Sequence, residues 1–247
     1  MTRRGMLHTS AGLAVAAPVA PLAGFVAGCG EDEPASSSTT TASGAPAPRD
    51  GDEALERLLA GNRRFRDEMA LSPERDTVRR LELAEGQEPF AVILGCADSR
   101  VPPEVIFDEG LGSLFVVRIA GNTAVDPFVV GSVEYAVEHL GSVLVMVLGH
   151  EGCGAVKGAI AEADGASEPG SIGDVIAPIV PVVEGVSEDT PELSAEELVE
   201  PSVQANVTAA VEDLSTADGL IAELVDSGEL KLVGAEYMLE SGEVALL

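Results

Sequence analysis

Short apolar segments that end in glycine recur along this chain, and they restrict its possible folds more than any other feature. Apolar runs of about four to eight residues, bounded by glycine, are typical of strands buried on both faces of a parallel sheet. Amphipathic segments rich in Arg and Glu lie between some of these runs. The alternation predicts an α/β fold, a mainly parallel β-sheet flanked by helices on both faces. The expected strands are 89–95, 114–119, 142–149 and 230–235, with a fifth at 242–247.

The segments between the strands predict helices. Leu55, Leu58 and Leu59 fall at helical spacing, and the expected helices cover 55–65, 128–140 and 155–163. The acidic, proline-containing stretch 165–200 predicts only a short helix near 172–183, followed by a surface loop. Ligands of such sheets bind beyond the carboxyl ends of the strands, so the residues after the strand glycines are the candidates for a site.

The net charge of −28 over 247 residues makes nucleic acid an unexpected partner, because phosphate binding requires a basic surface. The chain has two lysines, Lys157 and Lys231, and twelve arginines. A surface that is acidic and poor in lysine tolerates concentrated salt, which screens the repulsion between like charges. A GC-rich genome would produce the same composition, and the sequence does not distinguish the two origins.

The first 51 residues predict targeting features. Arg3 and Arg4 precede an apolar stretch with small residues and two prolines, a pattern that resembles a twin-arginine signal peptide over 1–28. The stretch ends in a lipobox-like sequence whose Cys29 would carry the lipid, although a plain signal with a chance cysteine has the same pattern. Residues 29–51, rich in Ser, Thr, Pro and acids, predict a flexible stalk. The predicted protein is therefore exported and lipid-anchored to the outer face of the cytoplasmic membrane, and the folded domain covers 52–247.

Two of the predicted strands are followed by residues that bind metals. Cys96, Asp98 and Arg100 come directly after the first strand, and His150 and Cys153 follow the third. Thiolate and imidazole are the ligands that zinc prefers, and three protein ligands leave a fourth position open, as in catalytic zinc sites. Because the carboxyl ends of parallel strands meet at one edge, we expect both groups at one metal.

Two other interpretations of these cysteines stay open at this point. Cys96 and Cys153 are compatible with a disulfide in an oxidising compartment, and a cysteine at a strand end is often only a small buried hydrophobic residue. A thiol-redox site is not expected, because the chain lacks a Cys-x-x-Cys pair.

The two groups together resemble the β-carbonic anhydrases. Cys-Ala-Asp-Ser-Arg at 96–100, followed by Gly-His-Glu-Gly-Cys-Gly-Ala at 149–155, is similar to the two metal motifs of that family. Further resemblance extends over about 52–247, at Leu58–Phe65, Arg118–Asn122, Gly131–Ala136, Val233–Tyr237 and Ser241–Gly242.

The resemblance implies a carbonic anhydrase, a zinc lyase that hydrates CO₂ reversibly to bicarbonate and a proton by attack of zinc-bound hydroxide. It implies that Cys96, His150 and Cys153 bind Zn²⁺ and that Asp98 and Arg100 are catalytic. Asp98 would become the fourth ligand in a closed state, and Arg100 would hold it off the metal. The residues expected to line the substrate pocket are Ala120, Gly121, Gly152 and Gly154.

The resemblance also implies a homodimer or a dimer of dimers. The bicarbonate regulation known in some members uses a tryptophan, which this chain lacks, so we do not expect it. His139 is interpreted as a surface residue rather than a proton shuttle. Two alternative functions stay open, a CS₂ or COS hydrolase on the same fold and a non-catalytic zinc-binding lipoprotein.

Overall fold

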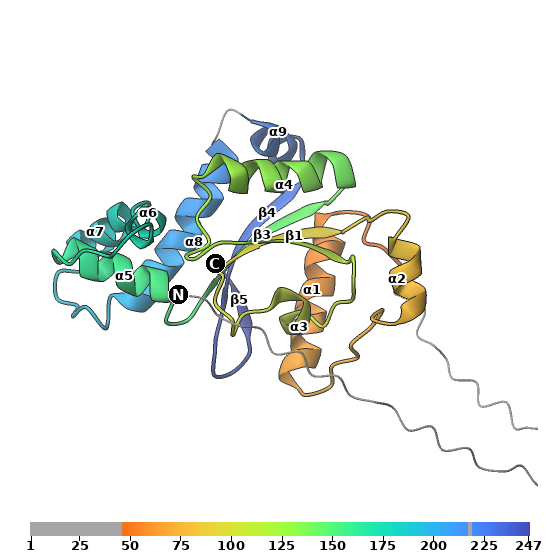
Figure 1. The fold of residues 1–247 in the computed structure, drawn as a ribbon, viewed down its shortest axis with the longest axis horizontal. Coiled ribbons are helices and arrows are strands. Elements are labelled where there is room, and N and C mark those ends of the chain that lie inside the picture. The colour runs from red at the N-terminus through yellow and green to blue at the C-terminus, as the bar shows by residue number, and fades with distance from the viewer. Residues whose placement is uncertain (1–45, 217–218) are drawn as a thin grey trace, which may run out of the picture. The chain divides into compact units, whose positions relative to one another are not determined.

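A five-stranded sheet forms the centre of the protein in the computed structural model, which describes residues 46–216 and 219–247 (Figure 1). The strands are in the order β2-β1-β3-β4-β5, and all neighbours are parallel except β4 and β5. The signal, lipobox and most of the stalk lie outside the described residues. The strands are β1 Ala91–Gly95, β2 Leu114–Arg118, β3 Leu144–His150, β4 Lys231–Tyr237 and β5 Val244–Leu246.

The register of the sheet determines where the site lies. Gly95 of β1 is opposite Leu148 of β3 and opposite Arg118 of β2, so all three strands end at the same edge. Both β1 and β3 are buried along their whole length, as expected for central strands of a parallel sheet. Cys96 and His150 therefore leave the sheet side by side.

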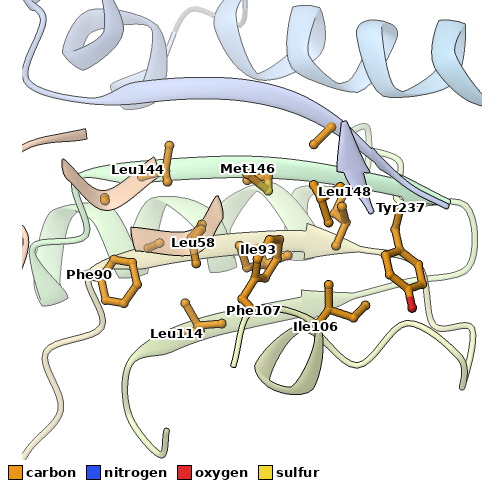
Figure 2. Packing of buried hydrophobic residues seen from close by; sticks show 14 of the residues in the cluster. Leu58, Phe90, Ile93, Ile106, Phe107, Leu114, Leu144, Met146, Leu148 and Tyr237 are labelled. Carbon is orange, nitrogen blue, oxygen red and sulfur yellow. The ribbon is translucent and has the colours of Figure 1, made fainter. Parts of the chain in front are cut away.

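Helices α1 (Gly51–Arg66) and α3 (Pro103–Ile106) pack on one face of the sheet. The Asp50 side chain accepts hydrogen bonds from two backbone N–H groups in the first turn of α1 and so caps that helix. Figure 2 shows the apolar cluster on this face, where the sheet residues Ile93 and Met146 lie with Leu58 of α1 and Phe107 at the end of α3.

Three other helices cover the opposite face: α4 (Pro127–Leu140), α8 (Val199–Thr216) and α9 (Leu220–Ser227) (Figure 1). Their apolar side chains pack against the alternate residues of the same central strands, such as Val92 and Val145. The prediction of helices on both faces of a mainly parallel sheet is therefore confirmed.

A third apolar cluster lies next to the carboxyl edge of the sheet and contains Cys96 and Cys153. It is built by α5 (Gly154–Ala163), α6 (Ile172–Ile176), α7 (Val180–Asp189) and the first turns of α8. Two of the three ligand candidates are thus enclosed by apolar side chains.

The helical content exceeds what the sequence predicted. The stretch 165–200 was expected to hold one short helix and a loop, but it contains α6 and α7, because buried Ile176, Ile179 and Val183 pack against α5 and α8. Helices α2 (Thr77–Leu83), α3, α8 and α9 were not predicted either. In the described part of the chain, no helix is long and apolar enough to cross a membrane.

Candidate metal centre

Cys96, His150 and Cys153 converge at the carboxyl edge of the sheet, as the sequence predicted. Cys96 follows β1 directly, His150 is the last residue of β3, and Cys153 immediately precedes α5. One ligand atom from each residue lies within 4.8 Å of the other two, and all three side chains are buried. The chain thus places two sulfurs and one imidazole nitrogen around a single point.

The two thiols are free and do not form a disulfide. Their sulfur atoms are 4.0 Å apart, about twice the length of an S–S bond. The hydrogen bond with Cys153 lowers the pKa of Cys96 to about 4, although burial opposes this shift. The same interaction with Cys96, together with burial, raises the pKa of Cys153. The pair therefore favours a thiolate at Cys96, the form of a cysteine that binds a cation.

His150 has the orientation of a metal ligand. Its Nδ1 lies 3.0 Å from the carbonyl oxygen of Glu151, which accepts the Nδ1 hydrogen when the imidazole is neutral. Its Nε2 is buried and has no hydrogen-bond partner among the described residues. A buried nitrogen without a partner is costly, and a metal ion bound between the two cysteines would satisfy it. The donor set and this free nitrogen fit zinc.

Asp98 and Arg100 form a bidentate ion pair beside this cluster. The Nε of Arg100 donates to Oδ1 of Asp98 at 2.9 Å, and its Nη2 donates to Oδ2 at 2.7 Å. The hydrogen bonds from Arg100 hold the pKa of Asp98 well below its usual value, although burial acts in the opposite direction. Oδ2 of Asp98 is 3.9 Å from Nε2 of His150, so the carboxylate lies beside the free ligand nitrogen.

Arg118 fixes the loop that carries Cys96 and Asp98. Its Nε donates to the carbonyl oxygen of Cys96 at 2.8 Å, and its Nη2 donates to the carbonyl oxygen of Asp98. In the sequence, Arg118 stands out only as part of a turn that resembles the family, and no role was predicted for it. The position of Arg118 at the end of β2, beside the end of β1, was the available signal.

The small residues predicted to line the pocket lie near the cluster to different degrees. The N–H of Gly121 points at Sγ of Cys96, 3.4 Å away. Gly152 lies between the two ligands of the second motif and has a positive φ of 63°, which favours glycine. Ala120 adjoins Gly121, and Gly154 begins α5 with open space where a side chain would point. His139 is exposed on α4, where its ring makes an edge contact with the ring of Tyr135.

Comparison with known proteins agrees with this geometry. The family model described as carbonic anhydrase matches residues 91–244. The chain is 40% identical to carbonic anhydrase 2 of Mycobacterium tuberculosis over 195 residues, which cover 76% of this chain and 89% of that protein. It is also 32% identical to a carbonic anhydrase of Synechococcus elongatus, covering 77% and 70% of the two chains.

Solved structures resemble the fold as well. The β-carbonic anhydrase of Coccomyxa, solved with acetazolamide, aligns with a TM-score of 0.62 and 30% identity, and the match covers 78% of this chain and 86% of that one. A tetrameric β-carbonic anhydrase of Sordaria macrospora gives a TM-score of 0.63 at 25% identity, with 78% and 96% covered. By sequence, fold and the donor set at the sheet edge, the chain belongs to the β-carbonic anhydrase family.

Proposed function

We propose that this protein catalyses the reversible hydration of CO₂ to bicarbonate and a proton, with zinc held by Cys96, His150 and Cys153. The observation that carries this proposal is the buried set of two sulfurs and one unpartnered imidazole nitrogen. Three protein ligands leave one position for water or substrate. When bound, zinc supplies a Lewis acid that makes hydroxide available from water near neutral pH.

The role we assign to Asp98 and Arg100 is control of that open position. Asp98 is ionised, and its Oδ2 faces the ligand set, where it can accept the proton of a reacting water. Arg100 engages both oxygens of the carboxylate, which keeps Asp98 from joining the ligands. If Arg100 moved away, Asp98 would be free to close the site. A protein that only stores zinc has no need for such a pair.

The test is CO₂ hydration measured beside metal content. Protein loaded with one zinc per chain should hydrate CO₂, while protein stripped by a chelator should not, and activity should return with zinc. Cys96→Ser, which replaces a thiolate with a weaker ligand, should lose both the metal and the activity. Zinc-loaded wild-type protein that fails to hydrate CO₂ would disprove the proposed function.

We also propose that the protein is exported by the twin-arginine route and anchored by a lipid on Cys29. The support is the sequence alone: the arginine pair, the short apolar stretch and the lipobox-like residues before Cys29. Mass spectrometry of native protein should find diacylglycerol on an N-terminal Cys29. Protein from a Cys29→Ala strain should appear in the soluble fraction, and its retention at the membrane would contradict the anchor.

A homodimer or a dimer of dimers is the assembly we propose. The support is the exposed apolar surface beside the edge strand β2, where the Phe128 side chain is 85% exposed and that of Tyr135 50%. A Sordaria relative is described as tetrameric. Light scattering after gel filtration should give the mass of two or four chains, and a monomer at all concentrations would contradict this.

A further inference from the structure

Helix α8 connects the apolar cluster around the cysteines to the face of the sheet covered by α4 (Figure 1). It packs on β3, β4 and α5, three elements that surround the metal centre. Val203 and Val207 of α8 lie so close to Gly149 that a Cβ built there would come 2.5 Å from Val207. The helix is therefore in tight contact with the residue before His150.

Glu200, in the first turn of α8, holds one of the two metal turns. Its Oε1 accepts a hydrogen bond of 2.9 Å from the N–H of Gly152. Gly152 lies between the ligands His150 and Cys153, and its left-handed backbone conformation determines the direction in which Cys153 points. Removal of the acceptor would leave this turn without its fixed link to α8.

Asn206 holds the other turn from the same helix. Its Nδ2 donates to the carbonyl oxygen of Gly121 at 2.7 Å, and the Asn206 side chain is only 3% exposed. The N–H of Gly121 in turn points at the sulfur of Cys96. Hydrogen bonds to a thiolate sulfur stabilise its charge and adjust how strongly it donates to a metal. Asn206 therefore acts on Cys96 through one intervening glycine.

We propose that Glu200 and Asn206 are positioning residues through which α8 sets the two ligand-bearing turns at zinc-binding distance. This inference rests on the proposed zinc site, but not on its catalytic activity. Glu200 bonds to the backbone between two ligands, Asn206 bonds to the backbone of the glycine whose N–H points at Cys96, and neither bond is made to a ligand itself. The helix thus joins Cys96 of one motif with His150 and Cys153 of the other.

A buried acid, Glu236, lies close to Glu200. Oε2 of Glu200 and Oε1 of Glu236 are buried and without partners in the described part of the chain. Burial raises the pKa of Glu236, the hydrogen bond from Gln204 lowers it, and Glu200 raises it again. Burial and the neighbouring Glu200 thus favour the neutral form of Glu236.

The test measures metal binding rather than catalysis. Glu200→Ala and Asn206→Ala should each weaken zinc binding by about tenfold, the lower end of the effect of outer-shell partners, in competition with a chromophoric chelator. With cobalt(II) in place of zinc, the thiolate-to-cobalt charge-transfer band should shift in both variants. Glu200→Gln keeps an oxygen that accepts the Gly152 N–H and should bind zinc within about threefold of wild type. Glu212→Ala, which removes an exposed acid from the same helix, is the matched control and should change nothing.

Wild-type zinc affinity and an unchanged cobalt spectrum in both alanine variants would overturn the proposal. An equal loss in Glu200→Gln and Glu200→Ala would also overturn it, because the charge of Glu200 rather than its hydrogen bond would then matter. Circular dichroism identifies variants that fail to fold. If Glu200→Ala is one of them, the zinc affinities of Glu200→Gln and Asn206→Ala decide the proposal. These experiments measure metal binding and not CO₂ hydration. Failure of the proposed reaction can therefore be distinguished from failure of this inference.

Discussion

The pairing of Asp98 with Arg100 depends on a local turn as much as on charge. Oδ1 of Asp98 accepts two hydrogen bonds from Arg100, one from the backbone N–H and one from the side-chain Nε, both at 2.9 Å. This backbone bond, from the residue two positions ahead, helps to orient the carboxylate toward the guanidinium. The guanidinium itself is more than half exposed, so its pairing energy is weakened by solvent, whereas its geometric effect on Asp98 remains.

We predict that Arg100→Ala keeps zinc and is about 10- to 100-fold less active, as expected when a residue that orients a group at the metal is removed. The three ligands are untouched, but the carboxylate loses both of its guanidinium bonds. The activity of Arg100→Lys should fall between that of the wild type and that of Arg100→Ala, because an ammonium cannot bind both oxygens in the same plane. Zinc content and CO₂ hydration measured on one preparation decide it, and wild-type rates in Arg100→Ala would contradict the control we assign to this pair.

Helix α1 approaches α3 more closely than a side chain would permit. A Cβ built on Gly61 would overlap the carbonyl oxygen of Phe107, and the neighbouring Asn62 bonds to the backbone at Ile106 and at Gly242. The Asn62 Oδ1 also accepts from the N–H of Val244, the first residue of β5. One buried amide thus links α1 to two elements that lie far from it in sequence.

We therefore predict that Gly61→Ala lowers the free energy of unfolding by about 1–3 kcal/mol, the usual cost of overpacking. The clash is with a backbone atom, which cannot move aside easily. Gly185→Ala is the matched control, because Gly185 is exposed in α7 and a Cβ there meets nothing within 4 Å. That change should be neutral or stabilise by about 0.5–1 kcal/mol. Thermal melts of both variants would refute the packing argument if they shifted equally.

The whole molecule carries a charge of −28. Some of the basic side chains pair with buried acids: Arg57 with Glu109 and Arg64 with Asp108. Hydrogen bonds from Arg64 and from two backbone N–H groups outweigh the effect of burial and lower the pKa of Asp108. The remaining acids repel one another across the surface, and this repulsion destabilises the folded state.

Added sodium chloride should therefore raise the melting temperature, because the screening length falls from about 10 Å at 0.1 M to about 3 Å at 1 M. The melts are recorded at fixed pH with zinc content measured at each concentration. A sucrose series serves as the control, since sucrose acts by exclusion from the surface and not by screening. A melting temperature that does not rise with salt would favour the GC-rich genome as the source of the acidity.

Local sequence patterns predicted the strands of the sheet and the three residues that meet at its carboxyl edge. Apolar runs that end in glycine are local patterns, and they predicted β1 to β4 within about two residues at each end, because a strand buried on both faces must be apolar throughout. The convergence of Cys96 with His150 and Cys153 also followed, since parallel strands end at one edge. The targeting segment and the roles of Asp98 and Arg100 remain predictions.

The surroundings of that site could not be predicted from local patterns and were seen only in the folded protein. The structure shows that the two thiols stay apart, that α6 and α7 occupy the expected loop, and that Glu200 and Asn206 reach the metal turns. Asn206 and Gly121 are 85 positions apart, and no local pattern links them. Their contact exists because α8 packs against β3 and β4, and this packing is driven by burial of the apolar surfaces of these elements.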